Sequence, residues 1–343
     1  MLTDRQLQIF QVIIDEFIES AHPVGSRAIS EKENINVSAA TIRNAMAELE
    51  SMGFLEKTHS SSGRIPSEKG YRYYVDHLIP PVKEKQEINL IKHLIDDGIY
   101  EFEQLIQMAA EILSDLTNYT SIILGPEIFE TNLKQIQIVP LSPQTAVAIL
   151  ITNTGYVEHR TFSIPPEIQT SDLEKMVNIL NDRLRNVPII NLEEVLNNEV
   201  LSLMKRYIRN VEDSFAYLRE IFLHEHPIKL YIGGKSNLFT QPEFNDVNKI
   251  HSFYSMMERE EEIANLIKRK TNGIKVTIGN ENEAEAIKNF SLITASYELG
   301  DNQKGTIALL GPTRMQYRKV INLLSALSNE MTNALVMRNK KQE

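Results

Sequence analysis

An arginine and an asparagine stand next to each other in the stretch 37–52, VSAATIRNAMAELESM. At helical spacing the small and polar side chains share one face, which holds Ala39, Ala40, Arg43, Asn44 and Ala47, with Thr41 near its start. The opposite, apolar face holds Ile42, Ala45 or Met46, and Leu49. Arginine and asparagine make bidentate hydrogen bonds to guanine and adenine edges, and alanine lets a helix approach a groove floor. The stretch therefore predicts a helix that reads DNA bases.

Two further helices are predicted to position this reading helix. The first covers 3–20, with Thr3 and Gln6 at capping-box spacing and apolar residues along one stripe. His22-Pro23 ends it, because a residue that precedes proline disfavours helical dihedrals. Ser26 is the expected cap of a short second helix over 27–32, and Ser38 is the expected cap of the reading helix.

A small hairpin is predicted after the reading helix. Gly53 provides a left-handed helix stop, 54–57 has a strand-like alternation, 59–63 is a polar tip, and 64–66 returns as a second strand. Three helices and a hairpin define a winged helix-turn-helix. The predicted DNA contacts come from the second helix, the reading helix and the hairpin: Ser26, Arg27, Ser38, Ala39, Ala40, Thr41, Arg43, Asn44, Lys57, His59, Ser61 and Arg64.

The charge of the chain argues against strong non-specific attraction to DNA. The formal net charge is −10, and residues 1–80 hold eight basic and eleven acidic residues. The segment 57–72 is the exception, with four basic residues against Glu68, so any basic face is narrow. Taken alone, a serine-capped helix with arginine on its surface could equally be an ordinary solvated helix that binds nothing. The glycine stop and the basic hairpin together favour DNA binding.

The remainder of the chain predicts an α+β fold with mostly antiparallel pairing. Pro80-Pro81 begins a linker, and a long amphipathic helix is expected over 88–116. Strands are expected at 121–124, 135–140, 145–152, 156–162, 229–234, 274–278, 292–299 and 306–310. Helices are expected at 168–185, 192–209, 211–223, 246–268 and 315–337, and the tail 338–343 is expected to fray. Tyr71, Tyr73 and Tyr74 suit a helix that docks the reading unit onto its neighbour better than they suit base stacking.

Sites for enzyme chemistry are weak in this sequence. Gly233-Gly234-Lys235-Ser236 lacks the earlier glycine of a phosphate-binding loop and predicts a turn after a strand. His224 and His226 do not share a helix face and have no evident third ligand. We therefore expect no enzyme activity, no metal and no cofactor. The absence of cysteine and of any apolar run near the roughly 20 residues of a membrane helix leads us to expect a cytoplasmic protein with no membrane contact.

The chain resembles a known family through five runs of sequence. They are VGSRAIS at 24–30, VSAATIRNAMAELESMGFLEKTHSSSGRIPSEKGYRYYVDHL at 37–78, LYIGGKSNL at 230–238, QPEF at 241–244 and GTIALLGPTRMQYRKVINLL at 305–324. Through them the sequence resembles the heat-inducible transcription repressors of the HrcA family, and the run 37–78 is the most specific.

The resemblance implies a winged-helix DNA-binding domain with a connecting helix over 1–79, a GAF-like domain formed by 80–129 and 226–343, and a dimerisation domain inserted at 130–225. It also implies a homodimer that binds an inverted-repeat operator of chaperone and chaperonin operons, is helped by the chaperonin GroEL and is relieved on heat stress. Two alternatives remain: a winged-helix regulator whose GAF-like domain senses a small ligand, and a chaperone-associated protein with no role on DNA.

Overall fold

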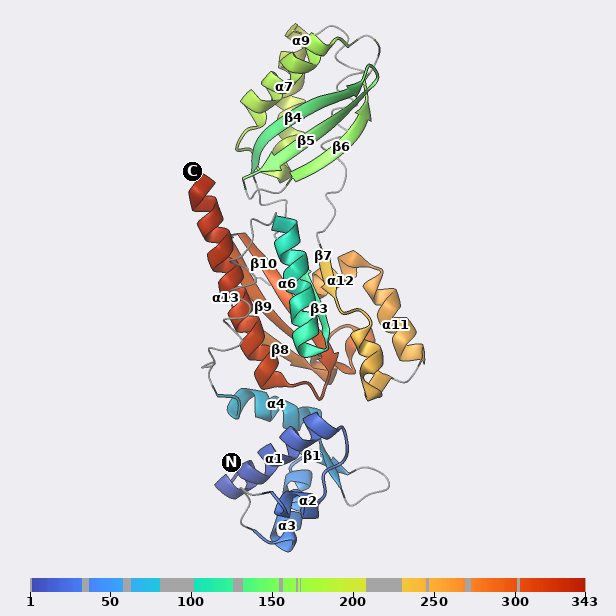
Figure 1. Ribbon diagram of the computed structural model, residues 1–343, viewed down its shortest axis with the longest axis vertical. Coiled ribbons are helices and arrows are strands. Elements are labelled where there is room, and N and C mark those ends of the chain that lie inside the picture. Colours follow the sequence, from blue (N-terminus) through green and yellow to red (C-terminus); the bar gives the residue numbers. More distant parts are fainter. Residues whose placement is uncertain are drawn as a thin grey trace.

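The structure is a computed structural model that describes residues 2–32, 37–57, 63–80, 102–125, 132–153, 157–164, 166, 168–207, 230–244, 247–268, 273–300 and 303–342. The elements follow one another along a long axis (Figure 1). A small helical unit at the amino-terminal end is followed by a five-stranded sheet, and a three-stranded sheet lies at the far end (Figure 1). We call the first unit the head and the two sheets the central sheet and the outer sheet.

The head consists of α1 (Asp4–Ser20), α2 (Ser26–Ser30), α3 (Ala39–Ser51) and a hairpin of β1 (Leu55–Lys57) with β2 (Arg64–Pro66). The predicted capping box at the start of α1 is confirmed, with both Thr3 and Gln6 making their reciprocal contacts. The reading helix α3 begins after Ser38, as predicted, and buries Ile42, Ala45, Met46 and Leu49. The three helices and the hairpin confirm the winged helix-turn-helix.

Gly53 ends α3 in the way its position predicted. Its φ is 80°, a left-handed conformation that favours glycine. The N–H of Gly53 donates to the carbonyl of Glu50, and the N–H of Phe54 donates to the carbonyl of Leu49, both at 2.9 Å. This pair of bonds is a Schellman motif, which satisfies two carbonyls at the end of the helix and turns the chain directly into β1.

The connecting helix α4 (Glu68–His77) lies between the head and the central sheet (Figure 1). The ring of Tyr71 packs on that of Tyr317 at 5.7 Å, which confirms that the tyrosine cluster docks the head. Tyr73 instead packs within the head, against Phe10 and Phe54. One hydrophobic core cluster runs without interruption from α1 and α3 through α4 to the central sheet, so the head is packed onto the sheet.

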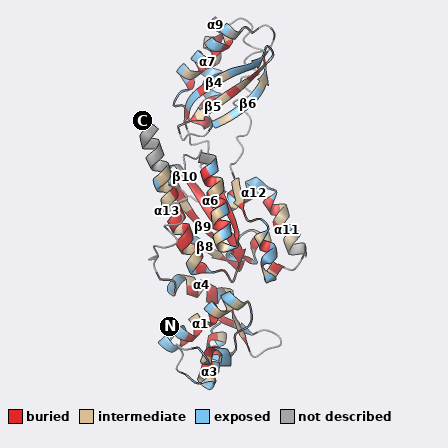
Figure 2. Ribbon diagram, viewed as in Figure 1, coloured by how far each residue is buried: buried red, intermediate tan, exposed pale blue. Residues whose placement is uncertain are grey.

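The central sheet has the strand order β7-β3-β10-β9-β8, and every neighbouring pair is antiparallel. Its strands are β3 (Thr120–Leu124), β7 (Leu230–Gly233), β8 (Ile274–Ile278), β9 (Phe290–Gly300) and β10 (Gln303–Pro312). The helices α6 (Phe102–Thr117) and α13 (Tyr317–Gln342) pack on one face, while α11 (Val247–Met257) and α12 (Glu260–Ile267) pack on the other. Figure 2 shows the buried residues concentrated between these layers. Short helical turns are η4 (Asn237–Thr240), η5 (Pro242–Phe244), η6 (Gly279–Glu281) and η7 (Glu285–Ile287).

The outer sheet has the order β4-β5-β6 and packs one face on helices. Its strands are β4 (Leu133–Ser142), β5 (Thr145–Thr152) and β6 (Val157–Ser163). The helical elements are α7 (Thr170–Leu184), η2 (Ile189–Asn191), α8 (Leu192–Val195), the π-helical turn η3 (Leu196–Val200) and α9 (Leu201–Tyr207). The central-sheet neighbours β3 and β7 lie before and after this unit in the sequence, so the outer sheet is reached by a long excursion of the chain.

Two predicted helices and the predicted end of the last helix differ from the structure. The expected helix over 246–268 is two helices, because Arg259 has the non-helical dihedrals φ −102° and ψ 84°. The expected helix over 192–209 contains the π-helical turn η3. The predicted fraying of the tail 338–343 is wrong, because α13 continues as a helix to Gln342. The helix expected over 211–223 lies outside the described residues, and so does the part of the helix expected over 88–116 that precedes α6.

Candidate nucleic-acid interface

The amino-terminal turn of α3 is held by its own polar side chains. The hydroxyl oxygen of Ser38 accepts a hydrogen bond from the backbone N–H of Thr41 at 3.2 Å, and the two hydroxyls lie 3.0 Å apart. Both hydroxyls therefore have a structural role at the helix cap. That role orients the first turn of the helix that is predicted to enter the groove.

The outward face of α3 is small and polar along its length. Ala40, Arg43, Asn44 and Ala47 are exposed, and Ala39 is half-buried. The apolar side chains of the same helix are buried against α1 and α2. Since α3 is fixed from behind, the side chains of Arg43 and Asn44 extend into solvent on a rigid support, which suits direct base readout.

The second helix begins one residue earlier than the sequence indicated. Gly25 is the N-cap of α2, and it makes no side-chain cap, so the predicted capping role of Ser26 is wrong. Ser26 is instead the first helical residue, because Gly25 already has the extended dihedrals φ −95° and ψ 154° of a cap. Ile29 is buried as expected, and Arg27 is exposed on the surface of the head.

The β1–β2 hairpin forms the wing of the winged helix-turn-helix. Among its described residues one basic side chain, Lys57, is exposed, and another, Arg64, is paired with a carboxylate. Lys57 is exposed at the end of β1, whereas His59 and Ser61 lie outside the described residues. The guanidinium of Arg64 donates to the carboxylate of Glu50 on α3 through Nε at 2.8 Å and lies 2.7 Å from it through Nη2. The backbone of Arg64 also forms a bridge with Val24. Arg64 thus fixes the wing to the head, and its contact with DNA stays a prediction.

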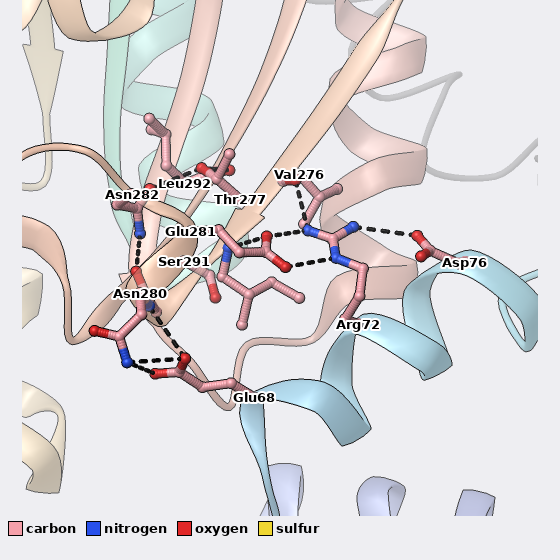
Figure 3. A network of polar contacts seen from close by, with 12 residues as sticks. Glu68, Arg72, Asp76, Val276, Thr277, Asn280, Glu281, Asn282, Ser291 and Leu292 are labelled. Atoms are coloured by element: carbon pink, nitrogen blue, oxygen red, sulfur yellow. Dashed lines mark hydrogen bonds and ion pairs between the residues drawn. The ribbon is translucent and has the colours of Figure 1, made fainter. Parts of the chain in front are cut away.

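Polar side chains whose contacts the sequence did not reveal join α4 to the central sheet (Figure 3). Arg72 forms an ion pair with Glu281, with Nε 2.8 Å from Oε1, and also donates to the carbonyl of Val276 at 2.8 Å. The carboxylate of Glu68 accepts from the backbone N–H and the side-chain amide of Asn280, both at 3.1 Å. We call Glu68, Arg72, Asn280 and Glu281 the polar network. Asp76 supports it through Arg72 at 3.1 Å.

Gly279 allows the polar network to close. Its φ is 54°, and a Cβ built there would lie 2.0 Å from Oε1 of Glu68, so a side chain would collide with the network. Partial burial raises the pKa of Glu281, but hydrogen bonds from Arg72 and from the backbone of Ile278 lower it more. The net pKa shift is downward, which keeps the Glu281 carboxylate charged opposite Arg72.

A second polar contact fixes the carboxyl end of α1. Arg314, which follows β10, donates to the carbonyl of Ile18 at 3.0 Å and to Gln241 at 3.2 Å, and it forms an ion pair with Glu243. The side chain of Arg314 is only 12% exposed. The head is therefore attached to the central sheet at two separate places, through α4 and through α1.

Other candidate sites gain no support in the described part of the chain. Gly233-Gly234-Lys235-Ser236 is the end of β7 and a turn, as predicted. No group of three histidine, aspartate or glutamate side chains lies close enough to hold a metal in the ranges that the structure describes, and His224 and His226 fall outside them. Within those ranges no helix combines the length and the apolar character of a membrane span.

A helix with an exposed Arg-Asn pair, fixed from behind and followed by a two-stranded wing, defines a winged-helix DNA-binding protein. Residues 1–75 match the family described as a winged helix-turn-helix transcription repressor, HrcA DNA-binding, and residues 103–321 match the HrcA protein C terminal domain. The heat-inducible transcription repressor HrcA of Oceanobacillus iheyensis is 65% identical over 335 residues, or 98% of each chain. The chain belongs to the HrcA family of heat-inducible transcription repressors.

One solved structure shares the whole fold. The crystal structure of a hypothetical protein at 2.2 Å resolution has a TM-score of 0.72 and 23% identity, and it covers 98% of this chain and 99% of its own. The crystal structure of the Thermotoga maritima IclR covers 97% of this chain and 100% of its own at 12% identity, but its TM-score of 0.23 supports no structural argument.

Proposed function

We propose that this repressor binds, as a homodimer, an inverted-repeat operator of chaperone and chaperonin operons and releases it on heat stress. The observation that carries the operator contact is the outward face of α3, where Arg43 and Asn44 are exposed on a helix that is buried behind them. Ser26, Arg27, Ser38, Ala39, Ala40, Thr41, Lys57, His59, Ser61 and Arg64 complete the proposed DNA contacts. The protein would act in the cytoplasm.

The proposed domain division follows the course of the chain. The winged-helix domain with α4 would cover 1–79, a GAF-like domain would combine 80–129 with 226–343, and a dimerisation domain would be inserted at 130–225. The pairing of β3 with β7 supports an insertion, since these neighbours in the central sheet flank the outer sheet in sequence. The separate hydrophobic core beneath the outer sheet supports a unit that folds around its own centre.

The open face of the outer sheet supports pairing with a second copy of the chain. Among the residues that the structure describes, helices cover one face of the outer sheet, and the register places Val139, Val147 and Ile149 together on the other. Val139 and Val157 are large apolar residues that are 43% and 48% exposed. A two-fold dimer through this face would present two heads to the two halves of an inverted repeat.

The chaperonin GroEL is the proposed partner that keeps the repressor active, and this part of the proposal rests on family membership alone. Under heat, unfolded proteins would occupy the chaperonin, and repression would then lapse. Operator binding after dilution of the repressor from denaturant tests it. Added chaperonin should raise the fraction of repressor that binds, and an excess of an unfolded competitor protein should remove that gain.

Selection of bound sequences from random duplex DNA tests the operator proposal directly. The selected sites should be inverted repeats whose half-sites are separated by whole helical turns of about 10.5 base pairs. Selection with Arg43→Ala should lose one conserved base in each half-site. Enrichment of no common sequence, or of single half-sites only, would contradict specific binding by a dimer.

A second candidate function is a winged-helix regulator that senses a small ligand. One observation favours it: a cavity of about 540 Å³ lies on the central sheet beside residues of the polar network.

A further inference from the structure

Gln6 on α1 is a buried polar side chain whose amide oxygen and amide nitrogen both make hydrogen bonds. It is 8% exposed. Its Oε1 accepts from the backbone N–H of Thr3 at 2.9 Å and from the Thr3 hydroxyl at 3.1 Å. Because only the oxygen of an amide accepts from an N–H, this bond fixes the orientation of the whole group. The Nε2 atom therefore points away from the cap, and it donates to Oε2 of Glu48 on α3 at 2.6 Å.

The bond to Glu48 is not needed for the helix cap. Thr3 and Gln6 complete the capping box by themselves, and glutamate serves at this position as well as glutamine does. Gln6 and Glu48 are 42 positions apart in the chain, and their contact joins the first turn of α1 to the reading helix. The contact therefore bears on how α3 is held and not on whether α1 is capped.

Two glutamates lie on opposite flanks of the outward face of α3. Glu48 and Glu50 are two residues apart, which is roughly 200° around a helix. Glu48 is held by Gln6 of α1, and Glu50 is held by Arg64 of the wing. The face that lies between the two flanks is therefore fixed from both sides, by a neutral donor on one and by a cation on the other.

Asn44 is the proposed base-reading residue that lies beside Glu48. It precedes Glu48 by four positions, so the two side chains are neighbours on the helix surface. Asn44 is exposed, and its amide makes no hydrogen bond among the described residues. A Glu48 carboxylate that Gln6 did not hold would be free to accept that amide in place of a base. Arg43 stands seven positions before Glu50, on the other flank, and is further from this competition.

We propose that Gln6 is a positioning residue for base recognition. By holding the Glu48 carboxylate against α1, it fixes the adjacent part of α3 and keeps the amide of Asn44 available to DNA. This role rests on the proposed function, because it requires that Asn44 contacts a base. It gives a part in sequence specificity to a side chain that lies outside the proposed DNA contacts.

Gln6→Glu separates this role from the helix cap. Glutamate keeps the capping box, but its carboxylate repels that of Glu48. Titrations of the full chain against the selected operator and its single-base variants give the preference at each base, and Asn44→Ala identifies the base that Asn44 reads. In Gln6→Glu the preference at that base should fall by at least about 3-fold, and the preference at the base identified by Arg43→Ala should fall by less.

Exchange of the two groups should restore the preference. In Gln6→Glu combined with Glu48→Gln, the carboxylate belongs to α1 and the amide to α3, so the hydrogen bond forms again with donor and acceptor exchanged. The preference at the Asn44 base should return to within about 2-fold of that of the natural chain. A merely structural role of Gln6 would lower the melting temperature and weaken binding to all sequences alike, without a change in base preference.

Gln107→Glu is the matched control. The amide of Gln107 donates to the carboxylate of Glu111 at 2.7 Å on α6, so the same kind of bond is removed outside the head, and every base preference should stay unchanged. An unchanged preference at the Asn44 base in Gln6→Glu, or a loss that Glu48→Gln does not reverse, would overturn the proposal. An Asn44→Ala protein that keeps every base preference would also overturn it. A natural chain without preference among sites would contradict the proposed function instead, so the two failures are distinguishable.

Discussion

Arg43 and Arg64 belong to the same small head but have opposite surroundings. Arg43 is exposed on the outward face of α3, whereas the side chain of Arg64 is 14% exposed and is paired with Glu50. An exposed arginine beside alanines is available to a base edge. An arginine that fixes the wing to α3 contributes first to the fold. The sequence gives both residues equal weight as DNA contacts, because the partner of Arg64 lies fourteen residues away on another element.

Arg43→Ala is expected to reduce operator affinity by about 1–3 kcal/mol and to relax the preference at one base, because the proposed bidentate contact of Arg43 with that base would be lost. Titrations against the selected operator and its single-base variants, at one fixed salt concentration, measure both effects. Lys57→Ala is the matched control, because an exposed cation on the wing is expected to contact phosphate. It should weaken binding to all sequences alike and lower the salt slope by about 0.9. An unchanged base preference in Arg43→Ala would exclude the reading role.

Arg64→Ala is expected to destabilise the head by about 1 kcal/mol, a modest value because the Glu50 carboxylate is partly solvated. Thermal unfolding of the single variants Arg64→Ala and Glu50→Ala and of the double variant measures the coupling between the two side chains. The two losses should be less than additive, since either change removes the same ion pair. Strictly additive losses would show that Arg64 stabilises the wing through other contacts.

At the scale of elements, the connecting helix α4 provides the main contacts that hold the head on the central sheet. It buries Tyr71 against the central sheet and extends Glu68 and Arg72 to η6 and β8. Arg72 has a raised pKa, first through its hydrogen bond with Glu281, so it stays charged at every relevant pH. The strength of the contact therefore depends on the ionisation of Glu281.

Glu281→Gln is expected to destabilise the folded chain by roughly 1 kcal/mol at neutral pH, because the ion pair is lost and its groups are partly exposed. The folded pKa of Glu281 lies below the ordinary value of 4.5. An acid of this kind contributes stability that is complete above the ordinary pKa and is lost as pH falls through the folded pKa. The difference in melting temperature between the two proteins should therefore be constant above about pH 5 and shrink toward zero in more acid solution.

Glu285→Gln is the control for this series. Glu285 also forms an ion pair, with Lys288, but its side chain is 85% exposed and lies outside the polar network. It should not change the melting temperature at any pH. A difference between the natural chain and Glu281→Gln that does not shrink at all as pH falls below 4.5 would show that the loss comes from packing and not from charge.

The elements that sequence predicted well are those whose signals are local. The caps at Thr3 and Ser38 and the stop at Gly53 lie within a few residues of the helix ends that they define. The polar network could not be predicted, because Arg72 and Glu281 are separated by 209 positions and each resembles an ordinary surface charge.

At the scale of the whole molecule, the small net negative charge of the head limits how tightly a single head can bind DNA. A head with fewer basic than acidic residues gains little sequence-independent affinity from phosphates. Joining two heads raises affinity without any new contact, because the second head binds at a high effective concentration. The continuous core and the two polar attachments hold the head on the central sheet, which would fix the distance between the two heads of the proposed dimer.

Val139→Glu on the open face of the outer sheet is expected to convert the proposed dimer to a monomer and to weaken operator binding by about 10²- to 10⁴-fold. The side chain is already 43% exposed in the single chain, so glutamate is tolerated there, whereas burial of its charge between two sheets is unfavourable. Light scattering measures the mass, and titration on the full operator and on a single half-site measures affinity. Half-site affinity should not change. Phe239→Glu is the control, because Phe239 is 50% exposed on the central-sheet unit, and it should leave the dimer intact. A Val139→Glu protein that stays dimeric would place the dimer contact elsewhere.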